Sequence, residues 1–242
     1  MNNMNELLKI IENRHSDRGL FDSERTIPRE DLEKILEAVR WTPSAHNMQN
    51  FEIIVVDDRK LLALISEIKH PPDLTFIKEN YYQLSFSEEE LRRKKVGILG
   101  TMFPQSWQTP DPQVEDIKND ERSLFMTKQI MSSSALLFVI YDPSRRAPAS
   151  VNDFLGIISL GCAMENMWLT ANSIGISVHI VSSLSGRGVE KEIKKILNIP
   201  DNLIIGITMR LGYQSASVNY LRVRRDIKDF THHNGFKNMG LD

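Results

Sequence analysis

A long apolar segment sets the strongest limit on how this chain can fold. The stretch that follows Asn152-Asp153 is almost continuously hydrophobic through Trp168 and stops at Gly175. Asn and Asp are frequent helix N-caps and glycine is a frequent C-terminal stop, so the pattern predicts a long helix capped at Asn152-Asp153. Because a helix that is apolar on all sides must be covered on most of them, we expect it to be the central helix of the fold.

Four shorter segments predict strands beside this helix. They have the length and the apolar character of strands, and they are Phe51 to Val56, Ala135 to Tyr141, Ser177 to Ser183 and Leu203 to Leu211. The compact apolar runs at Phe51 to Val56 and Ala135 to Tyr141 predict buried strands. Apolar residues at helical spacing predict further helices at Leu7 to Ile11, Pro28 to Val39, Asp58 to Ile65 and Val189 to Leu197. A charged helical stretch lies at Glu88 to Lys95. This alternation predicts a mixed α/β sheet covered by helices.

Two parts of the chain lack such patterns. Residues 71 to 130 are irregular and contain several prolines and aromatic residues, and a segment of this kind is typical of a lid or a pocket wall. Residues 213 to 242 form a tail without a clear amphipathic period, which therefore needs another surface to lie on. No repeat or linker divides the chain, so we expect a single domain over residues 1–242.

Composition disfavours several classes of protein. Lys and Arg total 30 against 32 Asp and Glu, and the formal net charge of -2 offers no basic field for a nucleic acid. The single cysteine, Cys162, cannot form an internal disulfide, which favours a reducing compartment. No stretch approaches about 18 uninterrupted apolar residues. We therefore expect a cytoplasmic protein with no membrane and no nucleic-acid partner.

The sequence also lacks the patterns of three other kinds of site. No pair of histidines has the spacing of a zinc-binding helix and no set of cysteines accompanies them, so we expect no metal site. Neither a Gly-x-Ser-x-Gly elbow nor a Walker loop occurs, which disfavours hydrolase and nucleotide triphosphatase functions.

Two basic clusters near the chain ends suit a dianion. Arg14-His15-Ser16-Asp17-Arg18 places two guanidinium groups and a hydroxyl directly after the first helix, and Arg222-Val223-Arg224-Arg225 lies near the other end. Arg and Ser side chains give strong, directional hydrogen bonds to phosphate. Taken alone, the first cluster also fits a solvated turn and the second an exposed surface. If the two ends converge, the clusters would form one dianion site.

A third cluster, Pro43-Ser44-Ala45-His46-Asn47-Met48-Gln49, leads directly into the first strand. Small and amide-bearing residues at such a place can approach a planar heterocycle closely and hydrogen-bond to its edges or to a polyol chain. The same residue types also form ordinary turns, so both interpretations stay open.

Taken in order, these motifs resemble the FMN-dependent nitroreductase family. The resemblance rests on Arg14-x-Ser16-x-Arg18, on a helix ending in Pro43-Ser44-x-x-Asn47-x-Gln49, on the helix from Asp153 to Gly175-Ile176, and on Ile199-Pro200 and Leu211-Gly212-Tyr213. It covers nearly the whole chain except about residues 71 to 130. It implies an α+β, or mixed α/β, nitroreductase-like fold with a central, mainly antiparallel sheet, and an intertwined homodimer.

The resemblance also implies a cofactor site. Arg14 and Ser16, with Arg224 or Arg225, would hold the FMN phosphate, and Arg18 would lie near the pyrimidine side of the flavin, where a fixed cation stabilises negative charge. Ser182 and Ser183 would present backbone donors to the flavin N5, although many relatives have an acidic residue and a glycine there. The residues expected to reach the flavin from the partner chain are Pro43, Ser44, Ala45 and Asn47, and His15 and Gln49 complete the expected cofactor-binding set.

The implied function is an FMN-dependent oxidoreductase. NADH or NADPH would give a hydride to the flavin, and a nitroaromatic, quinone or similar electron-poor acceptor would follow in a ping-pong cycle that needs no catalytic side chain. Other interpretations stay open: a flavoprotein of the same fold with other chemistry, such as reductive dehalogenation or ene reduction, a non-catalytic flavin-binding or redox-responsive protein, and a structural α/β dimer without flavin.

Overall fold

The computed structural model describes residues 3–69, 74–79, 81, 85–102, 107, 121–216 and 221–240. The chain forms two compact units, one made of residues 1–70 and 125–217 and the other of residues 71–124 and 218–242. The first unit contains most of the elements expected from the sequence. The single-domain organisation stays a prediction.

A four-stranded antiparallel sheet forms the centre of the first unit. Its strands are β1 (Phe51–Val56), β4 (Ala135–Tyr141), β5 (Ser177–Ile180) and β6 (Ile204–Gly212), in the order β1-β4-β6-β5. Every residue of β4 is buried, as its continuous apolar run predicts. β1 was expected to be equally buried, but it is an edge strand in which only Val56 is buried. That expectation was wrong because an apolar run alone does not distinguish an edge strand from a central one.

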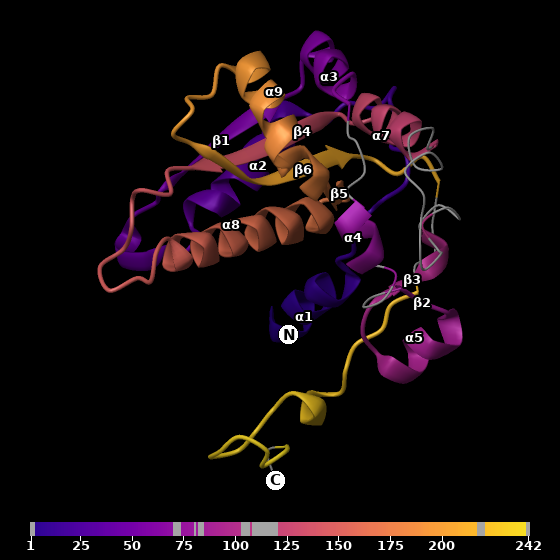
Figure 1. Ribbon diagram of the computed structural model, residues 1–242, viewed down its shortest axis with the longest axis vertical. Helices are drawn as coiled ribbons and strands as arrows, with labels where there is room; N and C mark the ends of the chain where they lie inside the picture. Colours follow the sequence, from indigo (N-terminus) through magenta and orange to yellow (C-terminus); the bar gives the residue numbers. More distant parts are fainter. Residues whose placement is uncertain are drawn as a thin grey trace. The chain divides into compact units, whose positions relative to one another are not determined.

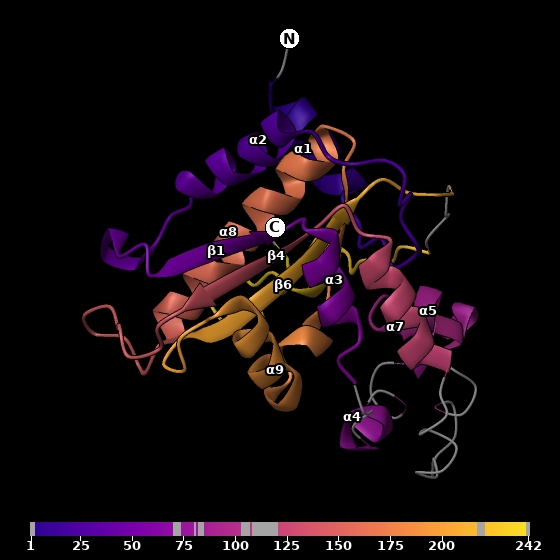
Figure 2. The same ribbon diagram turned by 90° about the horizontal axis from the view of Figure 1, so that it is seen from above.

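Helices cover both faces of this sheet, as expected. Seen from above, α2 (Arg29–Arg40) and α8 (Phe154–Ser173) lie on one side, and α3 (Arg59–Ser66) and α9 (Arg187–Leu197) lie on the other (Figure 2). α7 (Glu121–Met131) packs with α3 and α9, and α1 (Asn3–Asn13) lies along α8 (Figure 1). Side chains that alternate along β4 point into these two cores, Leu137 and Val139 toward α8 and Leu136 and Phe138 toward α7 and α9.

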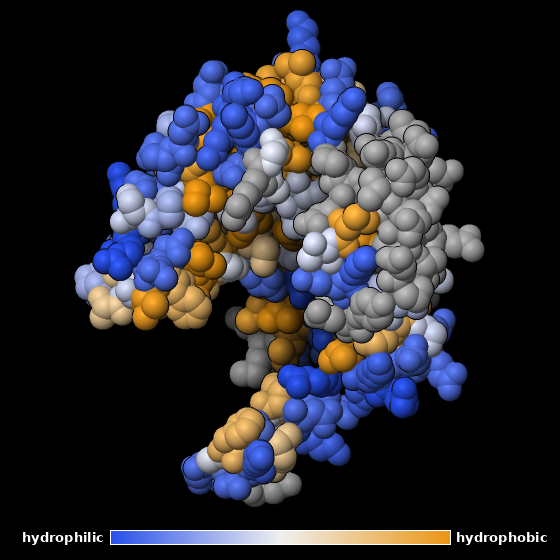
Figure 3. All heavy atoms as spheres, in the orientation of Figure 1, coloured by the Kyte–Doolittle hydropathy of each residue, from blue (hydrophilic) through white to orange (hydrophobic). Residues whose placement is uncertain are grey.

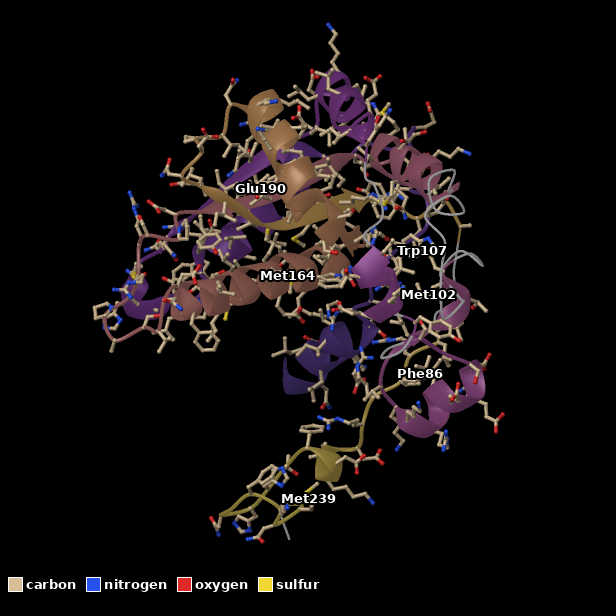
Figure 4. All side chains as sticks on the ribbon, in the orientation of Figure 1. Phe86, Met102, Trp107, Met164, Glu190 and Met239 are labelled. Atoms are coloured by element: carbon tan, nitrogen blue, oxygen red, sulfur yellow. The ribbon has the colours of Figure 1, made fainter. Side chains whose placement is uncertain are left out.

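The central helix α8 is buried only in part. Leu160, Ala163 and Met167 pack against the sheet, and Met164 lies beside them (Figure 4). Its first turns are exposed, because 60% of Phe154 and 48% of Ile157 are accessible to solvent. By length and composition α8 is also the one described helix that could cross a membrane, a test that core helices of globular proteins pass as well.

The start of α8 also differs from the expected cap. Asp153 occupies the N-cap position, but its carboxylate makes no capping hydrogen bond. It accepts instead from the Tyr141 hydroxyl, with an oxygen-oxygen distance of 2.8 Å. Burial and then this contact raise the pKa of Tyr141 to about 12, so the phenol remains a donor at neutral pH. Asp153 therefore joins α8 to β4 rather than capping the helix.

The second unit contains shorter elements, namely α4 (Leu74–Glu79), β2 (Ser85–Phe86), α5 (Glu88–Lys94), β3 (Ile98–Leu99), the 3-10 helix η3 (Gly100–Met102) and the 3-10 helix η6 (Ile227–Asp229). β2 and β3 pair in parallel, and Ile77 packs with Trp107. Lys95 Nζ and Asp226 Oδ2 form an ion pair of 2.5 Å, which ties the C-terminal segment to this unit. The helix expected at Glu88 to Lys95 is confirmed, and a large part of the expected lid lies outside the described residues.

Candidate functional site

The Arg14–Arg18 loop follows α1 and is held against β5 and α8. The Asp17 N–H donates to the Val178 carbonyl of β5 at 2.8 Å, and the Trp168 indole N–H of α8 donates to the His15 carbonyl at 3.1 Å. The Arg14 guanidinium lies 4.5 Å from the Trp168 ring centroid, and Arg14 Nε is 3.2 Å from Glu165 Oε1. The loop therefore has a defined shape, set by main-chain hydrogen bonds and by packing on α8.

A buried carboxylate lies inside this loop. Asp17 is 2% exposed, and its Oδ1 is 2.8 Å from His15 Nε2 and also accepts a hydrogen bond from the Gln214 amide. The Ser16 hydroxyl and the Arg18 guanidinium, in contrast, have no hydrogen-bond or ion-pair partner among the described residues. A hydroxyl and an exposed guanidinium that remain available beside an ordered backbone fit an anionic phosphate.

Ser182 and Ser183 follow β5 directly. They begin the 3-10 helix η5 (Ser182–Ser185), whose geometry leaves the first N–H groups without a partner inside the helix. Neither N–H donates to another residue in the part of the chain that the structure describes. Two adjacent backbone donors are thus available four to five residues beyond Val178, which bonds to the Arg14–Arg18 loop.

The segment from Pro43 to Gln49 is ordered but strained. His46, Asn47 and Gln49 have left-handed backbones, with φ of 52°, 52° and 44°. Such values cost free energy for residues other than glycine, and they cluster at functional sites. The strain is supported by hydrogen bonds from Gln49 N to Ser44 Oγ at 3.1 Å and from Gln49 Nε2 to Asn47 Oδ1 at 2.9 Å. His46, Asn47 and Gln49 are exposed, so their polar groups can reach a ligand or another chain.

Within one chain, the expected site residues divide between two parts of α8. The Arg14–Arg18 loop contacts Glu165 and Trp168, whereas the Ala45 N–H donates to Ser159 Oγ at 3.3 Å, nearer the N-terminus of the helix. Nine residues of helix from Ser159 to Trp168 span roughly 14 Å. The Arg14–Arg18 loop bonds to β5 and the Ser182-Ser183 pair follows this strand directly, whereas Pro43 to Gln49 contacts the other part of α8 in the same chain.

Arg224 and Arg225 belong to the second unit. Both are exposed, Arg224 donates to the Val223 carbonyl at 2.7 Å, and the Arg225 guanidinium lies 5.4 Å from the Phe230 ring centroid. Their place at the phosphate stays a prediction.

The sequence did not reveal the polar network behind the loop. Asp17, Gln214, His179 and Arg210 were not assigned a site role, although all lie in or beside the loop and β5 in the structure. One signal was present, because Arg210 is a lone charge within the apolar strand segment that ends at Leu211. A charged residue at a buried strand position calls for a specific partner.

Comparison with known proteins identifies the family. The sequence model of the Nitroreductase family matches residues 11–213. The chain belongs to the nitroreductase family. An NADH dehydrogenase/NAD(P)H nitroreductase from Archaeoglobus fulgidus is 27% identical over 87% of this chain and 86% of its own length. A chloronitrobenzene nitroreductase from Comamonas testosteroni is 24% identical over 92% of this chain and 94% of its own.

The solved structures show the same fold. A nitroreductase with bound FMN from Bacteroides fragilis matches with a TM-score of 0.56 and 21% identity, over 90% of this chain and 95% of that one. The nitroreductase fold expected from the motifs is therefore confirmed. Family membership and the two curated relatives also support the expectation of an NAD(P)H-dependent flavin oxidoreductase that uses FMN.

Proposed function

We propose that this nitroreductase-family chain binds FMN and catalyses the NAD(P)H-dependent reduction of electron-poor compounds. The observation that carries this proposal is that the region matched by the family model also contains a set of hydrogen-bond donors available to a ligand. Within residues 11–213, Ser16, Arg18 and the N–H groups of Ser182 and Ser183 are ordered and available to a ligand. These donors suit the phosphate and the polar edge of a flavin.

In this proposal each group has a separate role. Arg14 and Ser16 hold the phosphate, together with Arg224 or Arg225, and Arg18 places a positive charge at the pyrimidine edge. FMN held by these residues would supply hydride chemistry between NADH or NADPH and an acceptor, in a ping-pong cycle. The Ser182 and Ser183 N–H groups would donate toward the N5 edge of the flavin, and the protein would need no nucleophile or general base of its own.

We further propose a homodimer in which Pro43 to Gln49 reaches the site of the partner chain. This segment contacts α8 at Ser159, away from the Arg14–Arg18 loop, and exposed apolar side chains occur just before the segment and around the start of α8. They are Trp41, Val151, Phe154, Ile157 and Ile158. Figure 3 shows apolar atoms at the surface over the start of α8. A second copy of the chain would cover this face and would bring residues 43–49 to the flavin.

The acceptors are proposed to be nitroaromatics, quinones or similar compounds, and the cell compartment is proposed to be the cytoplasm. The name of the Comamonas testosteroni relative supports a nitroaromatic acceptor. Other flavin chemistry, such as dehalogenation or ene reduction, is the alternative, since one fold hosts several reactions.

An absorption experiment tests the proposal. The purified protein is incubated with FMN, desalted and mixed anaerobically with NADPH or NADH, and a nitroaromatic or a quinone is added last. We expect retained flavin bands that bleach with the nicotinamide and return with the acceptor. Retained bands that only dithionite bleaches would contradict the oxidoreductase function, and a colourless protein would contradict FMN binding.

A pair of matched variants assigns the effect to the site. Arg18→Met removes the available guanidinium, and we expect slower bleaching by the nicotinamide. Arg29→Met, an exposed arginine on α2, should behave as the unmodified protein. Equal behaviour of the two variants would remove Arg18 from the proposal.

A further inference from the structure

Arg210 on β6 has the largest of the fully buried side chains in the described part of the protein. It is 0% exposed. Burial lowers its pKa to about 9, so the guanidinium keeps its charge at neutral pH. A buried charge is costly unless surrounding groups compensate it. The surroundings of Arg210 therefore have to explain why a charged residue occupies this strand position.

The groups in contact with the guanidinium are neutral or aromatic. Nε donates to Ser133 Oγ at 3.0 Å, one terminal nitrogen donates to Ser132 Oγ at 3.3 Å, and the other lies 3.1 Å from His179 Nδ1. The Phe21 ring centroid is 4.4 Å from the guanidinium carbon. Because an arginine only donates, His179 accepts at Nδ1 and is neutral.

The same constraint fixes the direction of the next hydrogen bonds. Ser132 and Ser133 accept from Arg210, so their own hydrogens go to the Gln129 carbonyl in the last turn of α7, at 3.0 and 2.8 Å. The Gln129 amide donates to the Arg18 carbonyl, and Ser132 Oγ also accepts from the Phe21 N–H at 3.1 Å. Arg210 thus organises the turn that holds the backbone from Arg18 to Phe21.

Charge links Arg210 to the loop as well. The carboxylate of Asp17 lies close enough to interact electrostatically with Arg210, although the two side chains form no direct ion pair. Asp17 sits between the two residues proposed to meet the flavin, Ser16 and Arg18. Without Arg210, this buried carboxylate would repel a phosphate dianion nearby.

We propose that Arg210 is a positioning residue for the FMN phosphate, because it fixes the backbone after Arg18 and offsets the charge of Asp17. The inference rests on the proposed function, in which the Arg14–Arg18 loop holds that phosphate. Arg210 itself, buried behind the loop, does not touch the cofactor.

Paired ligands test this role. FMN and riboflavin share the ring and the ribityl chain and differ in the phosphate, so the ratio of their Kd values reports on the phosphate alone. The apoprotein and its Arg210→Met, Arg210→Lys and Asp17→Asn/Arg210→Met variants are titrated with each flavin by fluorescence. For Arg210→Met we expect the Kd of FMN to rise about tenfold while that of riboflavin stays within about twofold.

The other variants separate charge from general damage. Arg210→Lys keeps the charge and should lose less FMN affinity than Arg210→Met. The Asp17→Asn/Arg210→Met variant lacks the carboxylate as well, and it should regain part of the FMN affinity lost in Arg210→Met, as expected for coupled charges. An equal loss of both flavins in Arg210→Met and Arg210→Lys would show a general structural role and would overturn the proposal. If Arg210→Met does not fold, Arg210→Lys decides: a rise in the Kd of FMN that exceeds the rise in the Kd of riboflavin supports the positioning role, and an unchanged Kd of FMN or an equal rise for both flavins contradicts it. Unmodified protein that binds neither flavin would overturn the proposed function itself.

Discussion

At the scale of single residues, a close contact at the end of β6 fixes the chain beside the candidate site. A Cβ atom added at Gly212 would lie 2.6 Å from Phe21 Cδ2 and 2.9 Å from Phe21 Cβ. Phe21 cannot easily move away, because it is buried and its N–H is bonded to Ser132. Sterics therefore explain why glycine occupies the middle of the Leu211-Gly212-Tyr213 motif, which the sequence pattern alone did not explain.

We predict that Gly212→Ala lowers the free energy of unfolding by about 1–3 kcal/mol, the usual cost of overpacking a tight site. Gly161→Ala is the matched control, because its added Cβ meets nothing within 4 Å. Gly161 lies within α8, where alanine should stabilise the helix by about 0.5–1 kcal/mol. Urea denaturation followed by circular dichroism measures both, and a Gly212→Ala variant as stable as the parent would contradict the steric reading.

At the scale of elements, α8 shows both what a sequence can predict and where it fails. Its position and length follow from its apolar composition, but its exposed first turns do not. From its composition the sequence predicts that such a helix is buried, but it does not indicate which elements, or which other chain, cover it. β1 gave the same kind of error, since an edge strand and a central strand can have one composition.

We predict that Ile157→Glu converts a dimer of this protein into monomers, because a charge on the exposed face of α8 would have to be buried on association. Leu64→Glu, an equally exposed leucine on α3, is the control and should leave the dimer intact. Sedimentation velocity measures the assembly, and retention of FMN after desalting should fall together with dimerisation. A dimeric Ile157→Glu protein would place the interface elsewhere.

At the scale of the whole molecule, the proposed site needs residues from two chains. The order of the elements and the family motifs could be predicted from local patterns, as Arg14, Ser16 and Arg18 show. The network behind them could not, because Asp17 and Gln214 are 197 positions apart and no local pattern links them. The division into two units was equally beyond reach of such patterns, although the helix at Glu88 to Lys95 in the second unit was predicted.

Mixing two variants with impaired sites tests the shared site. Arg18→Met and Asn47→Ala would each damage both sites of a homodimer, but a mixed dimer would have one site with both native residues. Random pairing makes half of the dimers mixed, so we expect up to about one quarter of the parental activity to return. NADPH oxidation with a quinone, before and after subunit exchange, measures this. A mixture no more active than its components would show that each site lies within one chain.

The long-range bonds of the Arg14–Arg18 loop also bear on when the protein becomes functional during its synthesis. The loop is made near the beginning of the chain, yet Asp17 is held by Val178 and Gln214. At typical rates of translation, Gln214 is added roughly ten to forty seconds after Asp17. The Arg14–Arg18 loop can therefore acquire its shape only after Gln214 has been made, and capture of the proposed cofactor has to wait until then.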